Sequence, residues 1–132
     1  MVSDFFGASP LSSDGLAGRR VLVVEDEYLL ATDLAATLRR AGAEVVGPAA
    51  NVAAALEALD PPPDIACLDV RLGEEYSFPV ADELARLGVP FIFTTGSGGE
   101  IPPAHRHRPL CWKPLADDAV LQALAAAPAD AG

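Results

Sequence analysis

Short apolar runs alternate along the chain with longer segments in which apolar residues recur every three or four positions. The short runs are typical of strands buried on both faces, and the periodic segments are typical of helices that bury one side. This pattern predicts strands at residues 21–24, 44–48, 65–69, 90–95 and 110–113. It predicts helices at residues 28–41, from 52 to the prolines at 61–63, at 78–87 and at 115–127.

Strands that alternate with helices are expected to form one parallel sheet with helices on both faces. We therefore predict an α/β fold of the flavodoxin-like (βα)5 type, a doubly wound parallel five-stranded sheet with strand order 2-1-3-4-5. Residues 96–109 begin with glycines and serines and carry three prolines later, so we expect the fourth helix to be short or irregular. The second helix should be capped by Asn51. Its predicted inward-facing residues are Val52, Ala55, Leu56 and Leu59.

The length of 132 residues and the hydrophobic fraction of 51% suit a single domain with a sizeable core. The first residues are rich in Ser, Gly, Asp and Ala, which is typical of a loose terminus. We expect a flexible tail or linker over residues 1–18, a folded domain over 19–127 and a C-terminal tail over 128–132. Cys67 and Cys111 fall in separate predicted strands and are interpreted as buried free thiols in a reducing compartment.

The chain carries 19 acidic and 9 basic residues, which gives a net charge of −10. This charge disfavours nucleic acid as a partner, because nucleic-acid binding needs a basic surface. The negative charge instead fits partners that are proteins or cations. No apolar run is long enough to span a membrane and no secretory signal is visible, so we expect a cytoplasmic protein. The one basic cluster, residues 105–108, is interpreted as a solvated loop.

Polar residues stand where four of the predicted strands end. They are Glu25 and Asp26, Asp69, Thr94 and Thr95, and Lys113, the only lysine in the chain. Taken singly, each has a simpler role as a helix-dipole partner, a turn cap, a β-former or a surface charge. In a parallel sheet, however, the carboxyl ends of the strands share one edge, where ligands bind. We therefore predict one site built from these residues.

The residue types at this edge favour phosphoryl chemistry. Three carboxylates together repel one another, and a bound Mg²⁺ ion would relieve this repulsion. An ionised aspartate needs no general base to attack phosphorus, so Asp69 would become an aspartyl phosphate. A lysine charge and a threonine hydroxyl would bind the phosphoryl oxygens.

Four segments in this order resemble the receiver domain of two-component response regulators. They are residues 21–27, which end in Glu-Asp-Glu, residues 68–73, residues 90–96 and the Lys-Pro pair at 113–114. The resemblance covers residues 19–127. It implies that Asp69 is the phosphoacceptor and that Thr95 and Lys113 bind the phosphoryl group.

The same resemblance implies Mg²⁺ as a cofactor, with ligands from Glu25, Asp26, Asp69 and the backbone carbonyl of Arg71. It also implies that the bond between Lys113 and the following proline is cis. Residues 93–98, Phe-Thr-Thr-Gly-Ser-Gly, are similar to a single-domain subgroup of alphaproteobacteria whose motif reads Phe-Ala-Thr-Gly. One position departs from the usual receiver pattern, because Leu110 stands where an aromatic residue is commonly coupled to the threonine.

A receiver of this kind implies a signalling protein and not an enzyme, with catalysis limited to its own phosphorylation and dephosphorylation. Its phosphoryl donor would be a histidine kinase or a histidine phosphotransfer protein. It would act by docking a downstream protein or by draining phosphate from a kinase. The alternative is a C-terminal receiver excised from a hybrid histidine kinase.

Two other classes fit the residues less well. A Mg²⁺-dependent phosphatase with an aspartate nucleophile would carry that nucleophile after the first strand. Here the first strand ends in Glu25 and Asp26, and the candidate nucleophile, Asp69, follows the third strand. A flavin-binding protein would need a phosphate cradle at the same place, where three acidic residues would repel a phosphate group.

Overall fold

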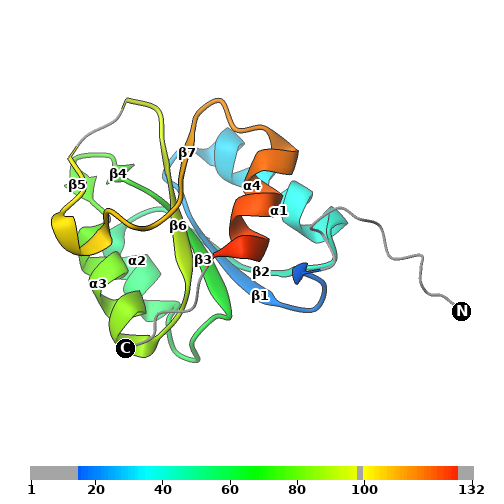
Figure 1. Cartoon of the computed structure of the whole chain (residues 1–132), viewed down its shortest axis with the longest axis horizontal. Helices are drawn as coiled ribbons and strands as arrows, with labels where there is room; N and C mark the ends of the chain where they lie inside the picture. The colour runs from blue at the N-terminus through cyan, green and yellow to red at the C-terminus, as the bar shows by residue number, and fades with distance from the viewer. Residues whose placement is uncertain (1–14, 98–99, 128–132) are drawn as a thin grey trace, which may run out of the picture.

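A computed structural model describes residues 15–97 and 100–127, and its centre is a parallel sheet of five strands (Figure 1). The strands are β1 (Arg20–Val24), β2 (Glu44–Ala49), β3 (Ile65–Asp69), β6 (Phe91–Thr95) and β7 (Leu110–Trp112). They lie in the order β2-β1-β3-β6-β7, and each neighbouring pair is parallel. The predicted order 2-1-3-4-5 is confirmed, because β6 and β7 are the fourth and fifth of the predicted strands.

Helices cover both faces of this sheet. The helices α1 (Tyr28–Arg40) and α4 (Asp117–Ala126) pack on one face, and α2 (Val52–Glu57) and α3 (Phe78–Leu87) pack on the other (Figure 1). Successive strand residues point to opposite faces. On β1, Val21 and Val23 therefore share a core with α1 and α4, whereas Leu22 and Val24 share one with α2 and α3. Because both faces are covered, the central strands β1, β3 and β6 are buried along almost their whole length and are largely apolar.

Local sequence signals are visible at the helix ends. Asn51 caps α2, since its side-chain oxygen accepts a hydrogen bond from Ala54 N at 2.8 Å. Gly88 follows α3 with a φ of 73°, a left-handed conformation that side-chain-bearing residues rarely adopt. Within the described part of 96–109 the only helical turn is η2 (Pro103–His105). The prediction of a short or irregular fourth helix is therefore confirmed.

Two local features differ from the prediction. Leu56 was expected to face inward but is exposed, whereas Ala55 and Leu59 are buried as expected. Between β3 and α3, where the pattern predicted neither a strand nor a helix, the strands β4 (Arg71–Leu72) and β5 (Glu75–Tyr76) form an antiparallel hairpin. Strands of two residues are too short to leave a periodic pattern in the sequence.

The basic cluster at 105–108 is not the solvated loop that the sequence suggested. His105 and Arg108 are buried, whereas Arg106 and His107 between them are exposed. The reason is the reduced fourth helix. The aromatic face of β6 still has to be covered, and the two inward side chains pack against its rings.

Of the two cysteines, Cys67 is buried as predicted, whereas Cys111 is only partly buried because β7 is an edge strand. Cys67 in β3 and Cys111 in β7 are free thiols, and β6 lies between their strands. Burial raises the pKa of both thiols, so they stay protonated at neutral pH.

The packed structure begins before the boundary predicted at residue 19. Leu16 is fully buried and belongs to the core between the sheet and the α1/α4 layer. Gly18 N donates a hydrogen bond to Gly42 O at 2.8 Å, which ties this segment to the end of α1. Residues 1–14 and 128–132 of the predicted tails lie outside the described residues.

The burial of Leu16 gives a testable consequence. Leu16→Ala is expected to lower the free energy of unfolding by about 3 kcal/mol, because it deletes buried methyl groups and leaves a cavity. Urea denaturation measures the loss. Leu29 is exposed at the start of α1, so Leu29→Ala is the matched control and should change stability by less than about 0.5 kcal/mol. Equally small losses in both variants would place Leu16 outside the core.

Candidate functional site

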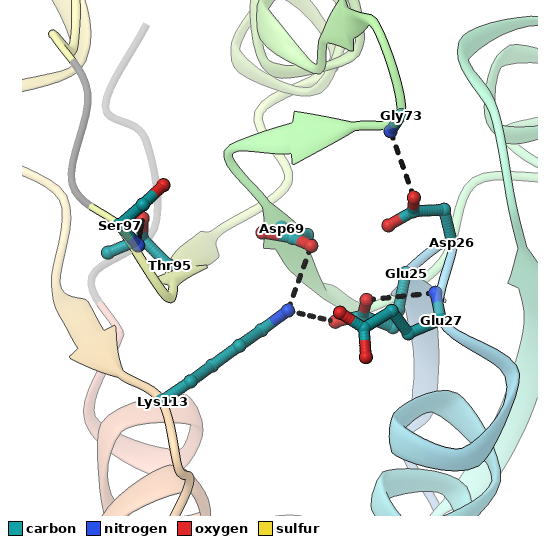
Figure 2. Close-up of polar contacts among 8 residues, drawn as sticks. All are labelled: Glu25, Asp26, Glu27, Asp69, Gly73, Thr95, Ser97 and Lys113. Carbon is teal, nitrogen blue, oxygen red and sulfur yellow. Dashed lines mark hydrogen bonds and ion pairs between the residues drawn. The ribbon is translucent and has the colours of Figure 1, made fainter.

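The carboxyl ends of β1, β3, β6 and β7 meet at one edge of the sheet. In the strand register Val24 lies beside Leu68, Asp69 beside Thr94, and Thr95 beside Trp112. The predicted site residues Glu25, Asp26, Asp69, Thr95 and Lys113 therefore gather at this edge (Figure 2). An open pocket of about 320 Å³ lies among them.

Lys113 connects two of the carboxylates. Its Nζ donates to Glu25 Oε1 at 2.8 Å and to Asp69 Oδ2 at 2.9 Å (Figure 2). The exposed fractions of these side chains are 13% for Lys113, 3% for Glu25 and 8% for Asp69. Because water is largely excluded from the contact, removing one partner would leave an uncompensated buried charge.

The same contact shifts two pKa values. Burial raises the pKa of Glu25, and the hydrogen bonds from Lys113 and the Glu27 backbone offset only part of this increase. Burial alone would lower the pKa of Lys113, but hydrogen bonds to Glu25 and Asp69 outweigh it, so this pKa lies above its ordinary value. Lys113 is therefore an ammonium group at neutral pH.

Backbone N–H groups orient the acid pair after β1. Glu27 N donates to Glu25 Oε2 at 3.1 Å, and Gly73 N donates to Asp26 Oδ2 at 2.9 Å (Figure 2). Gly73 sits at the tip of the β4–β5 hairpin with a φ of 64°. The hairpin, which follows β3, therefore orients the carboxylate of Asp26, which follows β1.

The three carboxylates fit a divalent cation. Oxygens of Glu25, Asp26 and Asp69 all lie within 4.8 Å of one another. They face one ammonium group, so the site keeps an excess of negative charge. Asp26 is exposed while the other two are buried, and a partly open set of oxygen donors suits Mg²⁺, which retains several of its waters.

Thr95 lines the pocket, whereas Thr94 does not. Both residues are buried, but neighbouring strand residues point to opposite faces, so only one of the two hydroxyls can turn to the site. Ser97 N donates to Thr95 Oγ1 at 3.4 Å (Figure 2).

Arg71 stands at the rim of the pocket. Its Cζ lies 4.8 Å from the centroid of the Tyr76 ring, and its Nη2 donates to Gly73 O at 3.3 Å. The guanidinium group is thus held against the hairpin. The role of the Arg71 backbone carbonyl as a ligand stays a prediction.

Sequence reasoning did not assign Glu27, Gly73 and Ser97 to the site, although all three line the pocket. Each contributes a backbone N–H that donates to a site side chain. Any residue type carries such a group. The only signal for them was therefore their position next to strand ends or at a glycine turn.

Comparisons with known proteins point to one family, although no protein-family model matches the chain. The solution structure of SdrG from Sphingomonas melonis Fr1 is 38% identical and covers 83% of this chain and 93% of that chain, with a TM-score of 0.72. The signal receiver domain of a modulated diguanylate cyclase from Desulfovibrio desulfuricans G20 is 32% identical over 80% of this chain and 90% of that chain, with a TM-score of 0.71. The transcriptional regulatory protein PdtaR of Mycobacterium tuberculosis is 38% identical over 74 residues, which are 55% of this chain and 36% of PdtaR.

The fold and these similarities define the class as a signal receiver domain. The chain belongs to the receiver-domain family of two-component response regulators. It matches about a third of the length of the curated relatives, 36% of PdtaR and 33% of the sensory transduction protein LytT of Bacillus subtilis.

Three further expectations can be set against the structure. The Lys113–Pro114 bond is cis, as the family resemblance implied. Among the described residues no helix is both long and apolar enough to cross a membrane. Membership of the Phe-Ala-Thr-Gly subgroup stays a prediction.

The buried contact of Lys113 predicts a pH-dependent stability difference. In the absence of divalent cations, Lys113→Met is expected to lower the free energy of unfolding by about 3 kcal/mol at neutral pH, because two buried carboxylates lose their counter-charge. The raised pKa of Glu25 would rise further in the variant. A carboxyl whose folded pKa is raised costs stability when it ionises, so the deficit should shrink as the pH falls from about 7 to about 5.

Urea denaturation across this pH range measures the effect. Arg40→Met is the matched control, because Arg40 pairs with Asp117 on the surface, where both side chains are exposed. An exposed pair contributes about 1 kcal/mol or less. A Lys113→Met deficit that is no larger than that of the control, or that grows as the pH falls, would contradict the role assigned to the contact.

Proposed function

We propose that this receiver domain accepts a phosphoryl group on Asp69 from a histidine kinase or a histidine phosphotransfer protein, with Mg²⁺ as cofactor. The observation that carries the proposal is the position of the only lysine, whose ammonium group contacts both Asp69 and the neighbouring acid Glu25. A positive charge beside the acceptor carboxylate is what a transferring phosphoryl group needs.

The reaction requires little of the protein beyond positioning. A carboxylate oxygen of Asp69 forms a bond to phosphorus while the bond from phosphorus to the donor nitrogen breaks. The nucleophile is the carboxylate form of Asp69, which attacks without a base to remove a proton first. The donor imidazole leaves with the electron pair and takes up a proton from water.

The groups around Asp69 divide the remaining work. Lys113 and the Thr95 hydroxyl would bind phosphoryl oxygens, because both line the pocket that opens above the acceptor. Glu25, Asp26, Asp69 and the Arg71 backbone carbonyl would hold Mg²⁺. The ion would neutralise charge on the phosphoryl group as it transfers.

The phosphorylated domain would act in signalling and not in turnover of a substrate. It would dock a downstream protein, or it would drain phosphate from a kinase. A receiver excised from a hybrid histidine kinase is the alternative origin of the same chemistry. The names of two relatives support a role in signalling. PdtaR is named as a transcriptional regulatory protein, and PhyR, whose structure is 32% identical, is named as a stress response regulator.

The acceptor role of Asp69 is tested by phosphorylation with a small donor. Incubation with acetyl phosphate and Mg²⁺ is expected to add one phosphoryl group to the wild-type chain and none to Asp69→Ala, because the variant has no carboxylate to attack phosphorus. Intact mass spectrometry reads both results.

Asp33→Ala is the matched control, since Asp33 is an exposed aspartate on α1 away from the acid cluster, and it should accept phosphate like the wild type. Phosphoryl addition to Asp69→Ala, or none to the wild type, would refute the proposal.

The metal role of Asp26 is tested by thermal unfolding. MgCl₂ should raise the melting temperature of the wild type, because a ligand that binds only the folded state stabilises it. Asp26→Asn keeps an oxygen to accept the Gly73 N–H but loses the charge. The MgCl₂ concentration for half of the shift should rise at least about tenfold, the loss typical even of outer-shell partners.

Asp33→Asn should titrate like the wild type, since it removes one surface charge without touching the acid cluster. An Asp26→Asn titration that overlays those two curves would show that Asp26 does not ligate the ion.

A further inference from the structure

Arg71 lines the pocket of the candidate site without pairing with any of its acids. Asp26 and Asp69 line the same pocket. Together with Glu25 they form the cluster of three carboxylates that faces a single ammonium group. Among the residues that the structure describes, Arg71 forms no ion pair with a carboxylate. A guanidinium beside carboxylates that outnumber their counter-charges would normally pair with one of them, so the local structure has to hold it elsewhere.

The hairpin holds the guanidinium through Tyr76. Arg71 in β4 and Tyr76 in β5 are direct partners in the antiparallel register, so their side chains lie on the same face of the hairpin. The guanidinium lies over the ring, with Cζ 4.8 Å from the ring centroid, and Nη2 donates to Gly73 O at 3.3 Å. A cation is attracted to an aromatic face, and the carbonyl oxygen accepts one of its hydrogen bonds. Two neutral groups thus bind the cation that the carboxylates would otherwise attract.

The Tyr76 ring is itself held in place by the fold. It stacks on Phe78 with the two ring centroids 5.2 Å apart and the ring planes 9° from parallel. Phe78 is the first residue of α3 and packs against the hydrophobic core on that side of the sheet. Tyr76 is 42% exposed and does not line the pocket. Any effect of this ring on the site therefore passes through the hairpin and Arg71.

The position of the guanidinium matters because it decides whether the carboxylate oxygens are free. The two buried acids of the cluster share the ammonium group of Lys113, whereas Asp26 is exposed and has no cationic partner. Asp26 Oδ2 accepts the Gly73 N–H at 2.9 Å, and the carbonyl of the same glycine accepts from Arg71. Gly73 thus binds the carboxylate and the guanidinium separately. A guanidinium fork that paired with Asp26 directly would occupy the oxygens that a cation needs.

We propose that Tyr76 is a positioning residue for the cation site, because it holds the Arg71 guanidinium off the three carboxylates and so keeps them free for Mg²⁺. The inference rests on the proposed function for the identity of the ion. Without the ring, the guanidinium pairs with the acid cluster, and this ion pair has to break before the oxygens can bind Mg²⁺. The affinity for the ion then falls although every ligand of the site is still present.

Thermal unfolding at a series of MgCl₂ concentrations tests the positioning role. The quantity compared is the MgCl₂ concentration needed for a given rise in melting temperature, which scales with the dissociation constant of the ion. In Tyr76→Ala this concentration should increase about fivefold, as expected for competition by an ion pair at the upper end of the exposed range. Tyr76→Phe keeps the ring that binds the guanidinium, so it should titrate like the wild type.

A double variant separates a released cation from a hairpin that has only lost packing. Tyr76→Ala combined with Arg71→Met has no guanidinium to occupy the acids, so its MgCl₂ requirement should return to the wild-type value or fall below it. Arg71→Met alone should need no more MgCl₂ than the wild type, because the native guanidinium is already held off the carboxylates. The melting temperature of each variant without MgCl₂ records any general loss of stability separately.

The outcomes separate the positioning role from the cation site itself. A Tyr76→Ala chain that needs no more MgCl₂ than the wild type overturns the positioning role. A double variant that needs as much MgCl₂ as Tyr76→Ala also overturns it, because the guanidinium is then not the competitor. Both results leave the cation site standing. If MgCl₂ does not stabilise the wild type, the proposed cation site fails, and the role of Tyr76 fails with it.

Discussion

A single ammonium group that compensates two buried carboxylates is the contact on which the site of this protein depends. Lys113 follows the edge strand β7, and its side chain reaches past β6 to Asp69 at the end of β3 and to Glu25 after β1. Buried acids without a counter-charge are costly, so the three strand ends must stay in register for the fold to tolerate them. The parallel sheet supplies this register. Its strands are apolar along most of their length, so the polar residues of the site stand at the strand ends.

The hairpin after Asp69 shows how backbone groups complete a site made of charged side chains. Its tip donates an N–H to Asp26, and its Tyr76 ring holds the Arg71 guanidinium. The short turn therefore contacts its neighbours from one side and leaves the pocket between Asp26 and Thr95 open.

The reduced fourth helix has consequences beyond the loop itself. Phe91 and Phe93 remain on β6 and must be covered, so the segment that follows turns His105 and Arg108 inward. Burying two basic side chains in place of a helix stripe makes the cover depend on polar partners such as Asp82. Such a cover is easier to displace than an apolar helix face, because its basic side chains lose their hydration when they are buried against the sheet.

The sequence was enough to predict the order of the sheet and most of the elements around it, because apolar periodicity is read locally. It also predicted that Glu25, Asp26, Asp69, Thr95 and Lys113 gather at one place, because the ends of parallel strands share an edge. The β4–β5 hairpin, the burial of Leu16 and the inward turn of His105 could not be predicted in this way. Each depends on which surface remains uncovered once the other elements have packed. A charged residue is assigned to solvent by its type, and only the tertiary structure shows that His105 faces two aromatic rings with a carboxylate within reach.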